Sequence, residues 1–264
     1  MDDLATGPVP NDALPPVVSA QEWERAYAEL LVEEKALTRA RDALAAKRRR
    51  MPMTAVTKAY RFVGPDGEVG LAEMFAGRAQ LILYRFFFDD DVDGWPDKGC
   101  GGCSFLASHV ADLRHLNARD TTFAMTSPAS QQQITQLAGR MGWSHIPWYT
   151  MPGKGSDLDF AADHGVDQYF GLNVFLRDGD QVYRTYFVNA RGGEILTPTW
   201  AMLDLTPFGR QENWEDTPPG RPQERPYGWW GRPDEYGPQR GSAMPEQPTW
   251  SGTAAGMPSG EQRA

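Results

Sequence analysis

The chain has 264 residues, of which 41% are hydrophobic and 23% are charged, and its net charge at pH 7 is −9. This composition excludes collagen and a wholly disordered chain, and the acidic balance argues against a nucleic-acid binder, which would carry a basic surface. No apolar run approaches the roughly 18 residues that a membrane helix needs. We therefore expect a folded protein whose partners are proteins or small molecules, with neither nucleic acid nor membrane among them.

The cysteine content and the start of the chain both favour a cytoplasmic location. The chain contains only two cysteines, too few for a disulfide-stapled secreted scaffold. Its first residues, Met1 to Leu4, lack the basic and apolar regions of a signal peptide. A reducing compartment is the resulting prediction.

The N-terminal part divides into a flexible leader, residues 1–18, and a helical extension, residues 19–51. The leader contains four prolines and few residues that could form a core. Ser19 and Glu22 have the spacing of a capping box, in which each side chain satisfies a free backbone amide at a helix start. A long helix is expected to begin there and to end before Pro52.

This predicted helix carries an apolar stripe with coiled-coil spacing. The stripe recurs every seven residues, at Trp23, Leu30, Leu37 and Leu44. Glu34 and Arg41 occupy the interleaved positions, where a coiled coil would have apolar side chains. The helix is therefore expected to pack either on the body of the protein or against a second copy, in a homodimer.

Strand and helix patterns alternate over residues 52–206, which predicts an α/β sandwich with a mixed central sheet. A hairpin is expected around the turn Gly64 to Gly67, and the apolar run Ala79 to Phe88 reads as a buried central strand. A helix is expected to start at the cysteines and to reach about residue 117. Further strands are expected at 121–125, 148–151, 171–176 and 182–188, and further helices at 130–141 and 194–203.

The tail is irregular in composition. From residue 207 to the end about a third of the residues are Pro or Gly, too many for a continuing core. Aromatic residues cluster in its first half, so residues 207–237 are expected to dock on the domain as irregular chain. Residues 238–264 are expected to be disordered.

The only two thiols of the protein, Cys100 and Cys103, are three residues apart, where a hydrophobic strand hands over to a helix. In this context Cys-x-x-Cys favours a redox site. Free amides at the helix start, together with Arg85 and Lys98, are expected to lower the pKa of Cys100. The aspartates of the acidic loop, residues 89–98, would raise it, and the helix start and the cations are expected to prevail. Cys100 would then attack a substrate and Cys103, one turn on, would resolve the mixed disulfide.

Three alternatives to a redox site are a zinc site, a calcium site and a pair of unreactive cysteines in the core. Zinc would need four ligands, and the chain supplies no second Cys-x-x-Cys; the histidines available are His109, His115, His145 and His164. The run Asp89 to Gly94 copies the start of a calcium loop but lacks its final glutamate. Two buried packing cysteines are the third alternative. We expect neither a metal nor another cofactor.

From Trp23 to Leu203 the sequence resembles the thioredoxin-like domain-of-unknown-function family 899, often described as predicted dithiol-disulfide oxidoreductases. The matching stretches are 34–42, 60–67, 80–86, 99–105, 140–143 and 203–207. Residues 230–236 also resemble the ending of the family, although proline stands at a position where the family usually has histidine. The resemblance implies a thioredoxin-like fold and a thiol redox role.

Two other functions stay open. Pro96 to Cys103 matches the peroxiredoxin pattern Pro-x-x-x-Thr-x-x-Cys with Cys100 in place of threonine, so Cys103 would attack peroxide and Cys100 would resolve. Alternatively, the protein is a redox sensor or adaptor whose long helix binds a partner.

Thioredoxin-like proteins commonly have a proline before the strand that faces the cysteines. Here Gly171 stands at that position, and Pro147 precedes an earlier strand.

Overall fold

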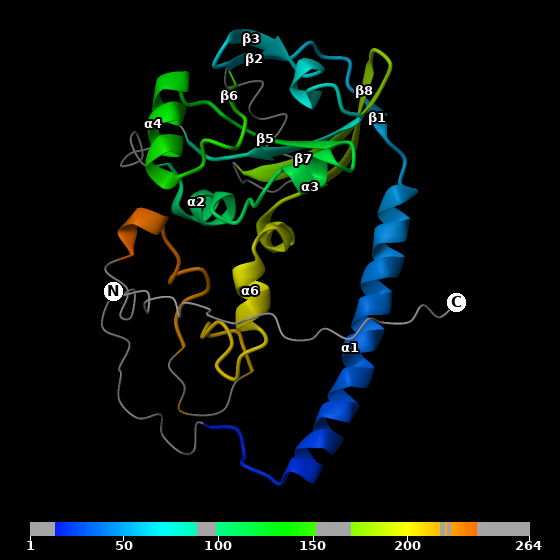
Figure 1. Cartoon of the computed structure of the whole chain (residues 1–264), viewed down its shortest axis with the longest axis vertical. Coiled ribbons are helices and arrows are strands. Elements are labelled where there is room, and N and C mark those ends of the chain that lie inside the picture. Colours follow the sequence, from blue (N-terminus) through cyan, green and yellow to red (C-terminus); the bar gives the residue numbers. More distant parts are fainter. Residues whose placement is uncertain (1–13, 89–98, 152–169, 217–219, 221–222, 237–264) are drawn as a thin grey trace, which may run out of the picture.

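The computed structural model describes residues 14–88, 99–151, 170–216, 220 and 223–236. Within them the chain forms one eight-stranded mixed sheet with the strand order β1-β8-β7-β4-β5-β6-β2-β3 (Figure 1). The strands are β1 (Thr54–Ala55), β2 (Arg61–Gly64), β3 (Gly67–Gly70), β4 (Gln80–Arg85), β5 (Thr121–Ser127), β6 (Trp148–Thr150), β7 (Gly171–Asp178) and β8 (Gln181–Val188).

Strand β4 is the centre of the sheet. It runs parallel to β5 on one side and antiparallel to β7 on the other, and β7 continues into β8 as an antiparallel hairpin. Leu81, Leu83 and Tyr84 of β4 are completely or almost completely buried. A strand that is covered on both faces needs apolar residues at successive positions, which explains the continuous apolar run in the sequence.

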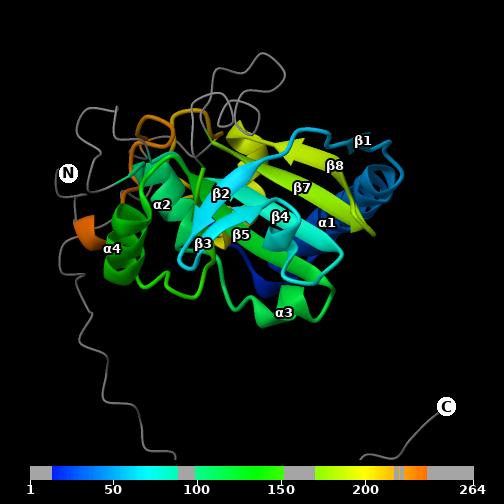
Figure 2. The same ribbon diagram turned by 90° about the horizontal axis from the view of Figure 1, so that it is seen from above.

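Short helices surround the sheet, and one long helix leaves it. The helices are α1 (Ala20–Arg49), α2 (Gly101–Ala107), α3 (Arg114–Asn117), α4 (Gln131–Met141) and α6 (Pro198–Leu203), with 3-10 turns η2 (Glu73–Phe75), η3 (Ala190–Leu196) and η4 (Pro233–Glu235). Seen from above, α2 and α4 lie together at one end of the sheet, and α1 lies beyond the opposite edge (Figure 2). None of these helices in the described ranges is long and apolar enough to cross a membrane.

Two apolar clusters fill the two faces of the sheet. One includes Tyr84, Phe105, Leu137, Trp148 and Trp200, and so joins β4, α2, α4, β6 and α6. The other gathers η2 and the β2–β3 hairpin around side chains that include Phe62, Met74 and Phe75. Together with the parallel β4–α2–β5 unit and the antiparallel β7–β8 pair, this layering gives the predicted thioredoxin-like α/β sandwich.

Two predicted helices are each split in the structure. The helix that starts at the cysteines ends at Ala107, where the Ser108 hydroxyl donates to the Ser104 carbonyl at 2.7 Å. The predicted helix 194–203 is interrupted because Pro198 has no amide hydrogen to continue η3, and it begins α6 instead. The domain boundaries assigned from the sequence, at 18, 51, 206 and 237, stay predictions.

The long N-terminal helix begins as predicted. The Ser19 hydroxyl accepts a hydrogen bond from the Glu22 amide at 3.3 Å, and the Glu22 carboxylate accepts one from the Ser19 amide at 3.0 Å. No side chain of α1 is buried, so the helix does not pack its apolar stripe on the described part of the domain.

The central strand sets the stability of the fold, and Leu83→Ala tests this. Leu83 is completely buried, and its truncation should lower the free energy of unfolding by about 2–5 kcal/mol, since a cavity remains in the core. Leu205→Ala, at a side chain that is 82% exposed, should change it by less than about 0.5 kcal/mol. Urea unfolding measures both, and equal effects would contradict the assignment of β4 to the core.

Candidate active site

The two cysteines lie at the start of α2, directly after the central strand. Cys100 is the N-cap residue of α2, and its amide donates to the Phe87 carbonyl at 3.0 Å. Gly99 has a positive φ of 63°, and a Cβ there would stand 2.8 Å from the Phe86 ring. Glycine is thus required for the chain to leave β4 and present the cysteine pair.

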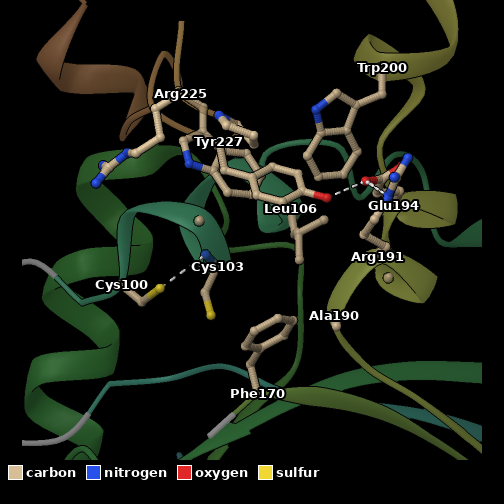
Figure 3. A pocket seen from close by; sticks show the side chains of 14 residues that line it. Cys100, Cys103, Leu106, Phe170, Ala190, Arg191, Glu194, Trp200, Arg225 and Tyr227 are labelled. Carbon is tan, nitrogen blue, oxygen red and sulfur yellow. Dashed lines mark hydrogen bonds and ion pairs between the residues drawn. The ribbon is translucent and has the colours of Figure 1, made fainter. Parts of the chain in front are cut away.

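The sulfur atoms have different surroundings. The Cys100 sulfur accepts a hydrogen bond from the Cys103 amide at 3.4 Å (Figure 3), and Cys100 is half-buried. The Cys103 sulfur accepts one from the Phe87 amide at 3.3 Å, and Cys103 is only 2% exposed. Both thiols are free, so the structure represents the reduced pair.

These surroundings separate the pKa values of the two thiols. A hydrogen bond from the Cys103 thiol lowers the pKa of Cys100 to about 7, with further lowering by the Cys103 and Gly102 amides and by Arg232, while burial opposes the shift. Burial raises the pKa of Cys103 well above its usual range, and the hydrogen bond to Cys100 raises it further. The largest cause of the lowered Cys100 pKa is therefore the neighbouring thiol rather than the helix start, and the role of Cys100 as the attacking thiol stays a prediction.

Among the described residues, Arg232 is a cation that lowers the pKa of Cys100, and the sequence analysis did not single it out. Its guanidinium donates to the Gly99 carbonyl at 3.2 Å and pairs with Glu235. Arg85, the cation predicted from the sequence, is completely buried at the end of β4, where it donates to the Phe86 carbonyl and lies over the Phe87 ring. Its role in stabilising the thiolate stays a prediction.

Tyr84 is a second side chain that the sequence analysis missed. Its hydroxyl is buried without a regular hydrogen-bond partner in the described ranges, yet its contact with the Cys103 thiol lowers the pKa of that thiol. Burial, followed by the charge of Cys103, raises the pKa of Tyr84. A proton-bearing hydroxyl therefore adjoins the buried sulfur.

A cavity of about 420 Å³ opens on the cysteine pair (Figure 3). Its walls are mostly apolar and come from α2, the start of β7, η3, α6 and the C-terminal segment, by which we mean residues 223–236. The lining residues are Cys100, Gly102, Cys103, Leu106, Phe170, Ala190, Arg191, Gly193, Glu194, Trp200, Arg225, Pro226, Tyr227 and Trp230. Such a shape, apolar with a few polar groups at one side, is typical of a small-molecule site.

Ion pairs form the polar side of this cavity. The Glu194 carboxylate accepts hydrogen bonds from the Tyr227 hydroxyl at 2.7 Å and from Arg210 at 3.1 Å, and Arg191 lies 3.3 Å from it. Arg210 in turn holds Asp204 with two contacts of 2.7 Å. Burial and the hydrogen bond to Glu194 raise the pKa of Tyr227 to about 12. This network fixes the Tyr227 ring as a wall of the cavity.

A buried carboxylate anchors the C-terminal segment. Glu212 is completely buried, and it accepts hydrogen bonds from the Tyr227 amide and the Trp229 indole, each at 2.9 Å, and from the Trp214 indole at 2.6 Å. A Cβ on Gly102 would stand 3.2 Å from the Trp230 ring, so this ring lies directly against the cysteine turn. The Pro/Gly-rich chain thus completes the site.

Two of the histidines that were weighed as zinc ligands, His109 and His145, make hydrogen bonds to neighbouring groups. His109 is held by the Phe105 carbonyl at 2.6 Å and by the Thr199 hydroxyl at 2.5 Å, and His145 by the Val110 carbonyl at 3.1 Å. Across the described ranges no three His, Cys, Asp or Glu side chains are grouped to hold a metal ion. The calcium-loop-like run Asp89 to Gly94, for which no calcium was expected, lies outside the described residues, as do Pro96, Lys98 and His164.

Strand order, layering and two closely spaced cysteines at the start of the helix after the central strand together define a thioredoxin-like protein. The chain belongs to the family described as "Bacterial protein of unknown function (DUF899)", whose model matches residues 12–236. The resemblance stated from the sequence is thus confirmed. No curated protein matches the chain.

Several solved structures are similar in part. A thiol:disulfide interchange protein from Bacteroides sp. aligns with a TM-score of 0.40 and 11% identity, over 55% of this chain and 86% of that one. BsSco, a member of the Sco family of cytochrome c oxidase assembly proteins, aligns with a TM-score of 0.33 and 16% identity, over 59% of this chain and 97% of that one. Peroxiredoxin Q from Xanthomonas campestris aligns with a TM-score of 0.34 and 15% identity, over 54% of this chain and 94% of that one.

Alkylation of Cys100 tests the electrostatics of the site. Because only the thiolate reacts, its rate with iodoacetamide should rise with pH with a midpoint near 7, below the value of about 8.5 for an unperturbed cysteine. Arg232→Ala should move the midpoint upward, since the thiolate loses a neighbouring positive charge. Arg225→Ala, which removes another arginine of the cavity, should leave it unchanged; a midpoint above 8 in the unaltered protein would contradict the assignment.

Proposed function

We propose that the protein is a thiol-disulfide oxidoreductase in which Cys100 attacks and Cys103 resolves. The observation that supports this most is the asymmetry of the pair: Cys100 has a lowered pKa and lies at the cavity, whereas Cys103 is buried with a raised pKa. A nucleophile needs the thiolate form at ambient pH, and a resolving thiol needs only to stay close.

The reaction proceeds in two exchanges. The Cys100 thiolate attacks one sulfur of a substrate disulfide, a bond forms between the two sulfurs, and the other substrate sulfur leaves as a thiolate. Cys103 then loses its proton and attacks the Cys100 sulfur, which releases the second substrate thiolate. The substrate gains two electrons and the protein keeps a Cys100–Cys103 disulfide, which an external dithiol must reduce again.

Peroxide reduction through Cys103 fits these surroundings less well. An attacking Cys103 would have to ionise inside apolar packing, where its pKa is raised. Although Cys103 lines the cavity, only 2% of its surface is exposed, whereas Cys100 is half-buried. We therefore place the peroxidase reading second to disulfide exchange.

The cavity favours small organic substrates over extended protein chains. Its volume of about 420 Å³ accommodates a molecule of drug-like size, and Leu106, Phe170, Trp200 and Trp230 give it aromatic and aliphatic walls. The C-terminal segment covers the cysteine turn, where an extended peptide would otherwise approach. We propose that an apolar or aromatic disulfide is the substrate class, and that the protein works in the reducing cytoplasm.

Single cysteine variants test the order of attack. Cys100→Ser should abolish reduction of a model disulfide, because the attacking sulfur is lost. Cys103→Ser should react once and stop as a mixed disulfide on Cys100, because nothing resolves it. Mass spectrometry of the trapped species identifies the sulfur that reacted; a mixed disulfide found on Cys103, or full turnover in both variants, would reject the proposed roles.

Substrate preference tests the cavity. The protein should reduce an aromatic disulfide such as dithiodipyridine with a lower KM than glutathione disulfide, which is larger and highly polar. Trp230→Ala should raise the KM for the aromatic substrate about tenfold, equivalent to ~1.4 kcal/mol, since one wall is lost. Trp23→Ala, at an exposed tryptophan of α1, is the matched control and should leave the KM unchanged.

A further inference from the structure

Within the described part of the chain, nothing packs on the apolar stripe of helix α1. Five of its large side chains are 43–60% exposed, namely Trp23, Tyr27, Leu30, Leu37 and Leu44. The helix extends over 30 residues, about 45 Å, away from the sheet (Figure 1). Most of the stability of a helix in a protein comes from packing one face, so α1 is built for a contact that the described chain does not provide.

The exposed side chains occupy one face. With Trp23 at position d of a heptad, Leu30, Leu37 and Leu44 also fall at d and Tyr27 falls at a. Positions a and d form the seam of a two-stranded coiled coil. Val32 falls at position f, on the opposite face, and is 65% exposed.

The charges of α1 are divided between its two halves. Residues 20–34 contain five glutamates and one arginine, a net charge of −4, whereas residues 35–49 contain six lysines or arginines and one aspartate, a net charge of +5. The helix dipole explains such a bias only in the first and last turns. Glu33, Glu34, Lys35 and Arg39 lie in the middle of the helix, beyond that reach.

We infer that α1 pairs with α1 of a second copy in an antiparallel coiled coil. In this orientation the acidic half of each helix faces the basic half of the other, so the two helices attract each other along their whole length. With the twofold axis near residues 35 and 36, Tyr27 lies opposite Leu44 of the second copy. Glu34 then lies within about one turn of Arg41 of the second copy, and the two polar interruptions of the seam neutralise each other.

A parallel pair would have the opposite electrostatics. Each acidic half would face an acidic half, and Glu34 and Arg41 would each face the same residue inside the seam. Like charges in such positions repel, and repulsion in a seam is stronger than on an exposed surface because water screens it less. The antiparallel orientation also places the two domains at opposite ends of the helix pair, because each domain follows the C-terminal end of its own α1, where Arg48 lies over the Tyr186 ring.

Paired aspartate variants test the contact. The full-length protein should sediment at twice its 29.4 kDa. Leu37→Asp, in the seam, should weaken the dimer about 100-fold or more, since a charge would be buried. Val32→Asp, at an equally exposed side chain on the opposite face, should leave it intact. A monomer in the unaltered protein, or a dimer that tolerates Leu37→Asp, would overturn the inference and would point to another occupant, such as the tail of the same chain.

Cross-linking tests the orientation. In a background of Cys100→Ser with Cys103→Ser, the pair Tyr27→Cys with Leu44→Cys should form intermolecular disulfides on oxidation. Tyr27→Cys alone should not, because residue 27 of the second copy lies at the far end of the helix. Cross-linking of the Tyr27→Cys variant alone would show a parallel pair and overturn the inference.

Discussion

One buried carboxylate holds together the part of the molecule that encloses the cysteines. Glu212 has no exposed surface, and three N–H groups from Trp214, Tyr227 and Trp229 satisfy it. A buried charge without such donors is strongly unfavourable, so the carboxylate and the aromatic chain around it order each other. Because the same stretch continues to Trp230 and Arg232, the anchor also determines the wall of the cavity and the positive charge beside Cys100.

The sequence predicts the central part of the sheet well because β4 is a long apolar run and clear turns join β2 to β3 and β7 to β8. The central run that contains Leu83, the turn after Gly64 and the hairpin of β7 with β8 all follow local patterns that need no knowledge of distant contacts. The helix breaks were harder to predict. Pro198 was a signal that could have been used, whereas no single residue marks the end of α2. The Ser108 hydroxyl donates to the Ser104 carbonyl there, but the Ser104 hydroxyl makes the same bond to the Cys100 carbonyl inside the helix.

Of the candidate site, only the two cysteines could be predicted from the sequence. Two cysteines at the end of a buried strand can be recognised from spacing, but their partners come from far along the chain. Arg232 reaches the Gly99 carbonyl across more than 130 residues, and no periodicity links them. Tyr84 could have been noticed as a hydroxyl within a buried strand, which usually acquires a polar neighbour. Arg85 is also a polar residue of this buried strand, and its guanidinium donates to the Phe86 carbonyl, a partner that the sequence does not indicate.

The glycines between the cysteines are not equivalent. A Cβ on Gly101 would meet no atom within 4 Å, whereas one on Gly102 would press on the Trp230 ring at 3.2 Å. Gly101 can therefore accept other side chains, but Gly102 can do so only if Trp230 shrinks or shifts. A larger side chain at the second position of this dipeptide therefore requires a compensating change at Trp230, so substitutions that tune the dithiol through its intervening residues meet less obstruction at Gly101.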